Sequence, residues 1–184
     1  MPKLDQKIKE KIGSLSKKDL EKLVIKAASS NQQFYDYLLV SHIDTEFAEG
    51  DMYEQALTDI KNLMNKNYKG FADELKLANM LAACNKRIAQ FGKNCKDKSR
   101  ELDLIMYVLE VPFSLPSKMF TTCFTNYNYR VFLMLKKAIT LLETKLHEDY
   151  MIQYAPKLNE YLSVFHKTSS HLDYVYGMQK EIKI

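Results

Sequence analysis

Two pairs of histidine and glutamate come nearest to a chemical site in this sequence. His42 and Glu46 lie four residues apart, as do Glu143 and His147, so each pair could share one helix face. A di-metal site in a helical bundle uses Glu-x-x-His spacing and further inward carboxylates. The spacing here is one residue longer, and the pattern shows no further inward carboxylates. We therefore expect no metal and no cofactor, with these four residues as the candidates should a metal bind.

No other motif fixes a reaction. His147 and Glu148 begin like the zinc-protease sequence H-E-x-x-H, but Met151 stands where the second histidine belongs. A glycine-rich phosphate loop, a nucleophile elbow and a pair of catalytic carboxylates are also missing from the pattern. The sequence favours a non-catalytic protein, and an enzyme built from scattered residues of a helical bundle is an alternative.

Acidic residues gather in a stretch without lysine or arginine, from residue 44 to residue 59. The stretch does not match a calcium loop, because Glu49 and Gln55 occupy the places of its glycine and its final glutamate. Helix capping and a solvated face explain these acids. The functional alternative is an acidic patch for a basic partner, including the lysine-rich end of another copy. The patch comprises Asp44, Glu46, Glu49, Asp51, Glu54 and Asp59.

Positive charge is concentrated in two segments, residues 1–26 and residues 86–100. The first 26 residues carry an excess of four positive charges, which equals the formal net charge of the whole chain, +4. A nucleic-acid surface would need both segments on one face, with arginines to contact phosphates and bases. Only three arginines are present, so nucleic-acid binding is an alternative. The predicted basic surface comprises Lys17, Lys18, Lys22, Lys26, Lys86, Arg87, Lys93, Lys96, Lys98 and Arg100.

Composition indicates a cytoplasmic protein. The chain has 184 residues and three cysteines, without C-x-x-C spacing, which favours reduced thiols in a reducing compartment. Cys84 follows Leu81-Ala82-Ala83, where we expect a small buried side chain rather than a nucleophile. The chain contains neither a signal-peptide pattern nor an apolar run of about 18 residues that could span a membrane.

The scarcity of glycine (five) and proline (four) favours long helices. Ser16 and Asp19 resemble a capping box, and Leu20, Leu23 and Val24 then follow at helical spacing. We expect this lysine-bearing helix to dock through its apolar face. A second helix should begin at Ser30 or Asn31.

Further helices follow towards the C-terminus. We expect a third helix to begin at Asp51 and to end at Lys69-Gly70. Residues 71–91 and a helix from about residue 126 should be central, because each carries many apolar residues. Pro112 should end the helix before it, and Pro156 should break the helix before it and begin the next one.

These elements predict an all-α fold with one domain over residues 1–184. We expect a bundle of about seven helices, and a short HEAT-like α-solenoid is the alternative. Residues 1–14 should be a lysine-rich lead-in, and residues 178–184 a frayed tail.

Two stretches resemble a family of small all-helical bacterial proteins of unknown function. They are Leu15-Ser16-Lys17-Lys18-Asp19-Leu20-Glu21-Lys22-Leu23, and Leu77-Ala78-Asn79-Met80-Leu81-Ala82-Ala83-Cys84 with Lys86-Arg87-Ile88. The resemblance implies a bacterial cytoplasmic protein and no particular catalytic residue.

Taken together, these patterns predict a helical interaction or scaffold protein. The amphipathic N-terminal region and the tyrosine-bearing helix faces would contact a protein partner or a second copy. We expect no membrane association.

Overall fold

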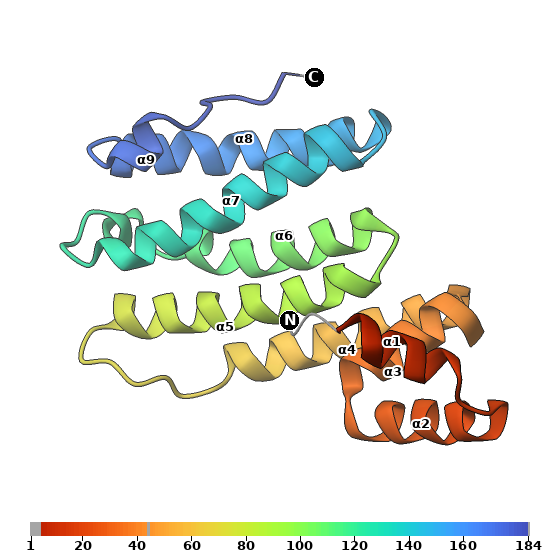
Figure 1. Cartoon of the computed structure of the whole chain (residues 1–184). Coiled ribbons are helices and arrows are strands. Elements are labelled where there is room, and N and C mark those ends of the chain that lie inside the picture. The colour runs from red at the N-terminus through yellow and green to blue at the C-terminus, as the bar shows by residue number, and fades with distance from the viewer. Residues whose placement is uncertain (1–4, 44, 184) are drawn as a thin grey trace. The chain divides into compact units, whose positions relative to one another are not determined.

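The computed structural model describes residues 5–43 and 45–183, apart from the side chains of residues 40 and 45–48. These residues form nine α-helices and no β-strand, which confirms the predicted all-α fold. The helices group into two compact units, Met1–Glu49 and Gly50–Ile184, which the prediction of one domain did not distinguish (Figure 1). Helix α4 (Thr45–Met64) begins in the first unit and continues in the second.

The first unit contains three short helices and one π-helical turn. They are α1 (Gln6–Gly13), α2 (Lys17–Ser30), α3 (Gln32–Leu38) and the turn η1 (Leu39–Ile43). The predicted cap of α2 is confirmed: the Ser16 hydroxyl accepts the Asp19 backbone N–H at 3.2 Å and donates to the Asp19 carboxylate at 2.6 Å. Asn31 caps α3 by accepting the Phe34 backbone N–H at 3.2 Å. Helix α1 lies in the segment that we had predicted to be a lead-in.

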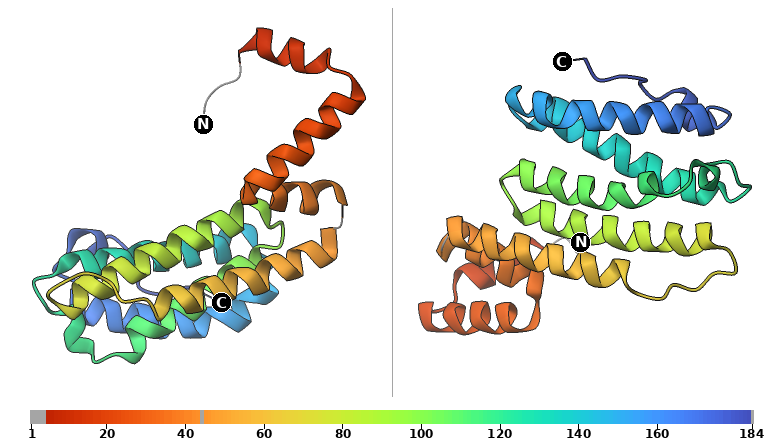
Figure 2. Two further views of the ribbon diagram at one scale, coloured as in Figure 1. Left: turned by 90° about the horizontal axis from the view of Figure 1, so that it is seen from below. Right: turned by 180° about the vertical axis from the view of Figure 1, so that it is seen from behind.

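The second unit is a helical bundle. After α4 come α5 (Asp73–Asn94), α6 (Lys98–Ser114), the 3₁₀ turn η2 (Ser117–Phe120), α7 (Thr125–Lys145), α8 (Asp149–Ser169) and the one-turn helix α9 (Asp173–Tyr176). Helices α5 to α8 lie side by side, and successive helices run in opposite directions (Figure 2). Helix α7 packs against α5, α6 and α8, which confirms its predicted central place.

Apolar residues of α5 to α8 form the core of this bundle. Helix α5 buries Leu81 and Ile88, and α7 buries Val131 and Leu135. At one end of the core, the rings of Phe120 and Tyr127 stack with their centres 5.3 Å apart. The periodicity that predicted these helices therefore also identified much of the core.

Two predicted helix boundaries on α4 are wrong. Gly50 lies inside this helix, because a helical glycine costs only about 1 kcal/mol and the residues around it continue the helix. The helix ends at Met64, before the Lys69-Gly70 pair. Gly70 has a φ of 159° and lies in the connection to α5.

Both predicted proline breaks are also wrong. Pro112 is the third residue from the end of α6, and Pro156 is the eighth residue of α8. Each proline leaves the carbonyl four residues earlier without its helical donor. At Pro156 that carbonyl belongs to Ile152, which is exposed, so water can replace the missing donor. The chain instead turns between α7 and α8 at residues 146–148.

The predicted frayed tail is wrong in its described part. Ile182 is buried, and its backbone N–H and carbonyl both bond to the Asn159 side chain, at 2.8 and 3.0 Å. The His166 Nε2 donates to the Gln179 carbonyl at 3.2 Å. Residues 177–183 are therefore fastened across α8, and we call them the C-terminal strap.

Candidate interaction surfaces

The structure describes three of the four side chains that we had proposed for a metal site. Glu143 lies on α7, while His147 follows the end of that helix and lies 3.1 Å from the Asp149 carboxylate. His42 lies in the π-helical turn with its ring edge against Tyr37, and the side chain of Glu46 is outside the described residues. Among the described residues, no group of three His, Cys, Asp or Glu side chains could hold a metal.

Much of the predicted basic segment 86–100 is neutralised inside the second unit. The Arg87 Nε donates to the Asp59 carboxylate of α4 at 2.7 Å. The Arg100 guanidinium lies 3.5 Å from the Asp97 carboxylate and 6.0 Å from the centre of the Tyr53 ring. These two arginines hold helices together and are poorly placed to bind a nucleic acid.

Lys98 is half-buried and likewise engaged in contacts within the second unit. Its ammonium donates to the carbonyls of Gly92 and Cys95, and it lies 3.3 Å from the Glu101 carboxylate. Lys137 of α7 reaches the other oxygen of the same carboxylate at 2.8 Å. Of the predicted basic segment, Lys86, Lys93 and Lys96 are the lysines on the exposed surface.

The acidic stretch is divided in a similar way. Asp59 is committed to Arg87, whereas Asp51 and Glu54 are exposed on α4 and Glu49 is half-buried. Asp44 and the side chain of Glu46 lie outside the described residues. An acidic patch formed by all six residues stays a prediction.

The lysines of α2 are all exposed. Lys18, Lys22 and Lys26 follow one another at intervals of four residues, so they form a ridge along the helix. Lys17 starts the helix at its N-terminal end. The first unit thus keeps its four predicted basic residues available to solvent.

Apolar side chains of α1 and α2 are also exposed. Ile8 and Ile12 share one face of α1, and Leu23 and Val24 belong to the apolar face of α2. No described side chain of the first unit is buried, and Ile8 and Leu23 are 47% and 51% exposed. We call five exposed apolar residues of α1, of α2 and of the turn between them the N-terminal apolar set: Ile8, Ile12, Leu15, Leu23 and Val24. Ile25 of α2 is 66% exposed and falls off the apolar face by helical spacing, so it is not included.

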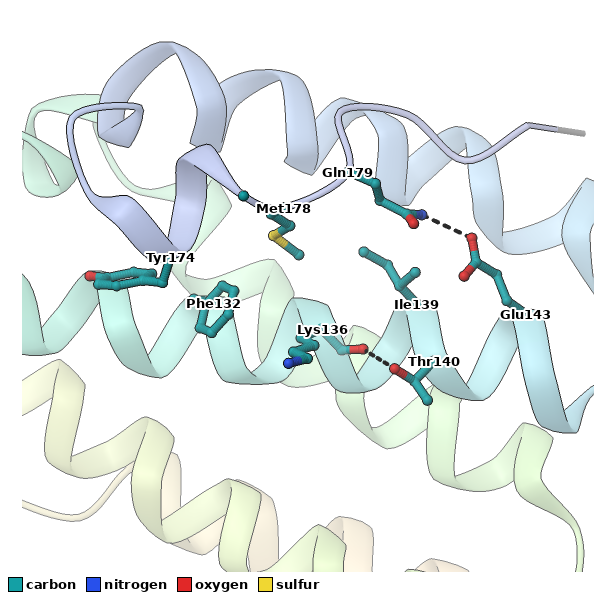
Figure 3. Close-up of a pocket in the computed structure, with 9 residues that line it drawn as sticks. Phe132, Lys136, Ile139, Thr140, Glu143, Tyr174, Met178 and Gln179 are labelled. Atoms are coloured by element: carbon teal, nitrogen blue, oxygen red, sulfur yellow. Dashed lines mark hydrogen bonds between the residues drawn. The ribbon is translucent and has the colours of Figure 1, made fainter.

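The second unit has a groove that the sequence patterns did not predict. It has a volume of about 420 Å³ and lies between α7 and the segment formed by α9 and the start of the strap (Figure 3). Phe132, Lys136 and Ile139 line it from α7, and Tyr174 and Met178 from the other side. The aromatic pair at residues 129 and 132 was a visible signal. The opposite wall could not be predicted, because it depends on contacts between residues that are far apart in the sequence.

The surroundings of Cys84 favour a structural rather than a catalytic role for this cysteine. The three cysteines, all within the described residues, form no disulfide. Cys84 is completely buried, as predicted, and burial raises the pKa of its thiol from 9.0 to about 11. A raised pKa disfavours the reactive thiolate, so Cys84 is unsuited to nucleophilic catalysis. Cys123 is exposed on the loop before α7.

Comparison with known proteins adds no functional information. No protein-family model matches the chain, and neither the curated proteins nor the solved structures yielded a significant match. The resemblance to a bacterial family therefore stays a prediction. Within the described part of the chain, no helix is both long and apolar enough to cross a membrane.

Proposed function

We propose that this chain is a non-catalytic helical interaction protein of the bacterial cytoplasm, and that α1 and α2 bind a protein partner. The observation that carries the proposal is the N-terminal apolar set. Its five side chains are between 37% and 51% exposed, and no described side chain of the first unit is buried. Helices of this kind gain most of their stability by packing an amphipathic face against another surface.

The charge beside these apolar residues indicates the kind of partner. Lys18, Lys22 and Lys26 form a ridge on α2. A partner helix with an apolar stripe and acidic flanks would complement this surface, because charge complementarity speeds association and fixes the register. The lack of a disulfide among the three described cysteines is consistent with a reducing compartment.

Crosslinking in cells tests this proposal. A photoreactive residue is placed at Ile12 of the full-length chain, and crosslinked proteins are identified by mass spectrometry. The paired variant Ile8→Ser with Leu23→Ser should lose the major crosslinks. The control is Ile152→Ser, which changes an exposed isoleucine of the second unit and should keep them.

Two results would overturn the proposal. The partner set could survive the Ile8→Ser and Leu23→Ser pair unchanged. Alternatively, the pair could lower the thermal midpoint of the purified protein by several degrees, while its crosslinks lead only to residues of the same chain. The apolar set would then be covered within the molecule rather than by a partner.

A further inference from the structure

The groove between α7 and the C-terminal segment has the build of a small-molecule site. Its volume of about 420 Å³ lies within the range of ligand pockets, roughly 300–1,000 Å³. Along α7, the lining residues Phe132, Lys136 and Glu143 are spaced by four and then seven residues, about one and two helical turns, so they follow one side of the helix. Figure 3 shows Tyr174 beside Phe132 at one end, and Gln179 beside Glu143 at the other.

One end of the groove is aromatic, and its middle is apolar. The rings of Phe132 and Tyr174 have their centres 5.0 Å apart, and Tyr129 packs edge-on against Tyr174 at 5.5 Å. The Tyr174 hydroxyl donates to the Thr125 carbonyl at 3.2 Å, so this residue offers the groove its ring and not its hydroxyl. Ile139 and Met178 line the middle of the groove. An apolar ligand body would therefore fit this part.

The two charged side chains of the groove, Glu143 and Lys136, differ in whether a ligand could pair with them. The Glu143 carboxylate already accepts the Gln179 side-chain amide at 2.9 Å. The Lys136 ammonium lies 5.9 Å from the centre of the Phe132 ring, and within the described part of the chain no carboxylate forms an ion pair with it. An ammonium at the edge of an apolar groove is suited to hold one anionic group.

The wall opposite α7 is held in place by hydrogen bonds to α8. Asn159 holds the backbone of Ile182 with two hydrogen bonds, and His166 holds the Gln179 carbonyl. These contacts fix the strap on both sides of residue 180. A preformed site loses less freedom on binding than one that must fold around its ligand.

We propose that this groove binds a small monocarboxylate with an apolar body. The carboxylate would accept from the Lys136 ammonium, and the apolar body would lie on Phe132, Ile139 and Met178. A phosphate ester fits less well, since the groove lining contains a single cationic side chain and no arginine. An aliphatic and an aromatic acid share the recognised chemistry, and the experiment below distinguishes them. This binding is independent of the interaction through α1 and α2.

The test follows methionine methyl groups of the full-length protein by NMR. Octanoate and 4-phenylbutyrate are titrated separately, each below its aggregation threshold, and the assigned Met178 methyl signal should shift saturably with at least one acid. The tighter of the two identifies the aliphatic or the aromatic class. Octanamide, which lacks the charge, should bind about three- to tenfold more weakly than octanoate.

A matched pair of lysine variants locates the carboxylate. Lys136→Met should weaken binding of the preferred acid by about three- to tenfold, because it removes the ammonium but keeps an unbranched side chain. Lys145→Met changes another exposed lysine of α7 that does not line the groove, and it should leave the affinity unchanged. Unchanged spectra of the core methyl groups would verify that both variants are folded.

Several results would overturn the proposal. The Met178 signal could fail to respond to either acid, or Lys136→Met could bind as tightly as the unaltered protein. Octylammonium could also bind more tightly than octanoate, which would make Glu143 the charge that selects the ligand. Equal binding of octanoate and octanamide would show that the groove recognises only the apolar body.

Discussion

Glu101 joins three helices through one buried carboxylate. Its side chain is 7% exposed and lies within 3.3 Å of Lys98 and 2.8 Å of Lys137. The carboxylate rests on Gly92 of α5, where an added Cβ would lie 2.2 Å from it. A buried carboxylate needs such partners because burial without them is costly. A glycine is therefore required at position 92, because any larger side chain would occupy the place of the Glu101 carboxylate.

The Gly92→Ala change should destabilise the unaltered protein but stabilise a variant that lacks the Glu101 side chain. In the unaltered protein we expect it to lower the free energy of unfolding by about 1–2 kcal/mol, since the methyl group displaces the carboxylate from its lysines. In a Glu101→Ala background it should raise stability by about 0.5–1 kcal/mol, because alanine is the better helix former. Urea unfolding of the four proteins measures this cycle. An equal cost in both backgrounds would contradict the close approach.

Cys84 should make the free energy of unfolding fall as the pH rises through the alkaline range. Burial raises the pKa of this thiol from 9.0 to about 11, so the folded protein keeps the proton that the unfolded chain releases. The resulting stability is fully present below pH 9 and is lost as the pH rises towards 11, by at most about 2–3 kcal/mol.

The Cys84→Ala variant should therefore show a shallower decline. We expect the free energy of unfolding to fall less between pH 8.5 and pH 10.5 in the variant than in the unaltered protein, although buried tyrosines such as Tyr154 add a decline common to both. Cys123→Ala changes an exposed cysteine and is the control. Parallel curves for Cys84→Ala and the unaltered protein would refute this assignment.

At the scale of elements, packing outweighs the local preference of proline. Helix α8 continues past Pro156 because Tyr154, Ala155 and Leu158 are buried on its inner side, while Pro156 is exposed. The sequence favoured a break because proline removes a hydrogen bond. The burial of its neighbours exceeds that loss, which a local pattern does not measure.

Pro156→Ala should accordingly stabilise the protein by about 1–2 kcal/mol. The new N–H can donate to the Ile152 carbonyl, and this gain exceeds the entropy that proline removes from the unfolded chain. Pro116→Ala is the comparison, because Pro116 precedes the turn η2 with a φ of −56° that suits proline, so it should destabilise slightly. Thermal unfolding measures both changes. A loss of stability in Pro156→Ala would show that α8 needs the proline.

At the scale of the whole molecule, the two units differ in how much they bury. The described residues of the first unit include no buried side chain, whereas α5 to α8 bury most of the core. Local stability follows buried contacts, so the units should open independently of one another.

Hydrogen exchange of the full-length protein checks this difference. Backbone amides of α1 and α2 should exchange at least about 100-fold faster than those of α5 and α7, because opening the first unit exposes little buried surface. Addition of a true partner should slow the exchange of α1 and α2 selectively. Equal protection of α2 and α7 in the isolated protein would mean that the N-terminal apolar set is already covered.

The candidate interaction surfaces could be predicted from the sequence only where the contacts that form them are local. Ser16 and Asp19 are three residues apart, and their mutual cap was predicted because its geometry depends on one helical turn. Arg87 and Asp59 are 28 residues apart, so the sequence showed a free cation where the structure has an ion pair. The same limit hid the groove, whose far wall depends on Asn159 and Ile182.

Local sequence patterns were enough to predict the helical class, the cap of α2 and the core faces of α5 and α7, because helix periodicity and capping act within a few residues. Contacts between distant segments set which charges are neutralised, where prolines are tolerated and where the groove forms. These outcomes depend on burial between distant segments, whose energies exceed local preferences of about 1–3 kcal/mol. The excess of positive charge in the first 26 residues thus became an exposed lysine ridge, while Arg87, Lys98 and Arg100 of the second basic segment became engaged in contacts within the second unit.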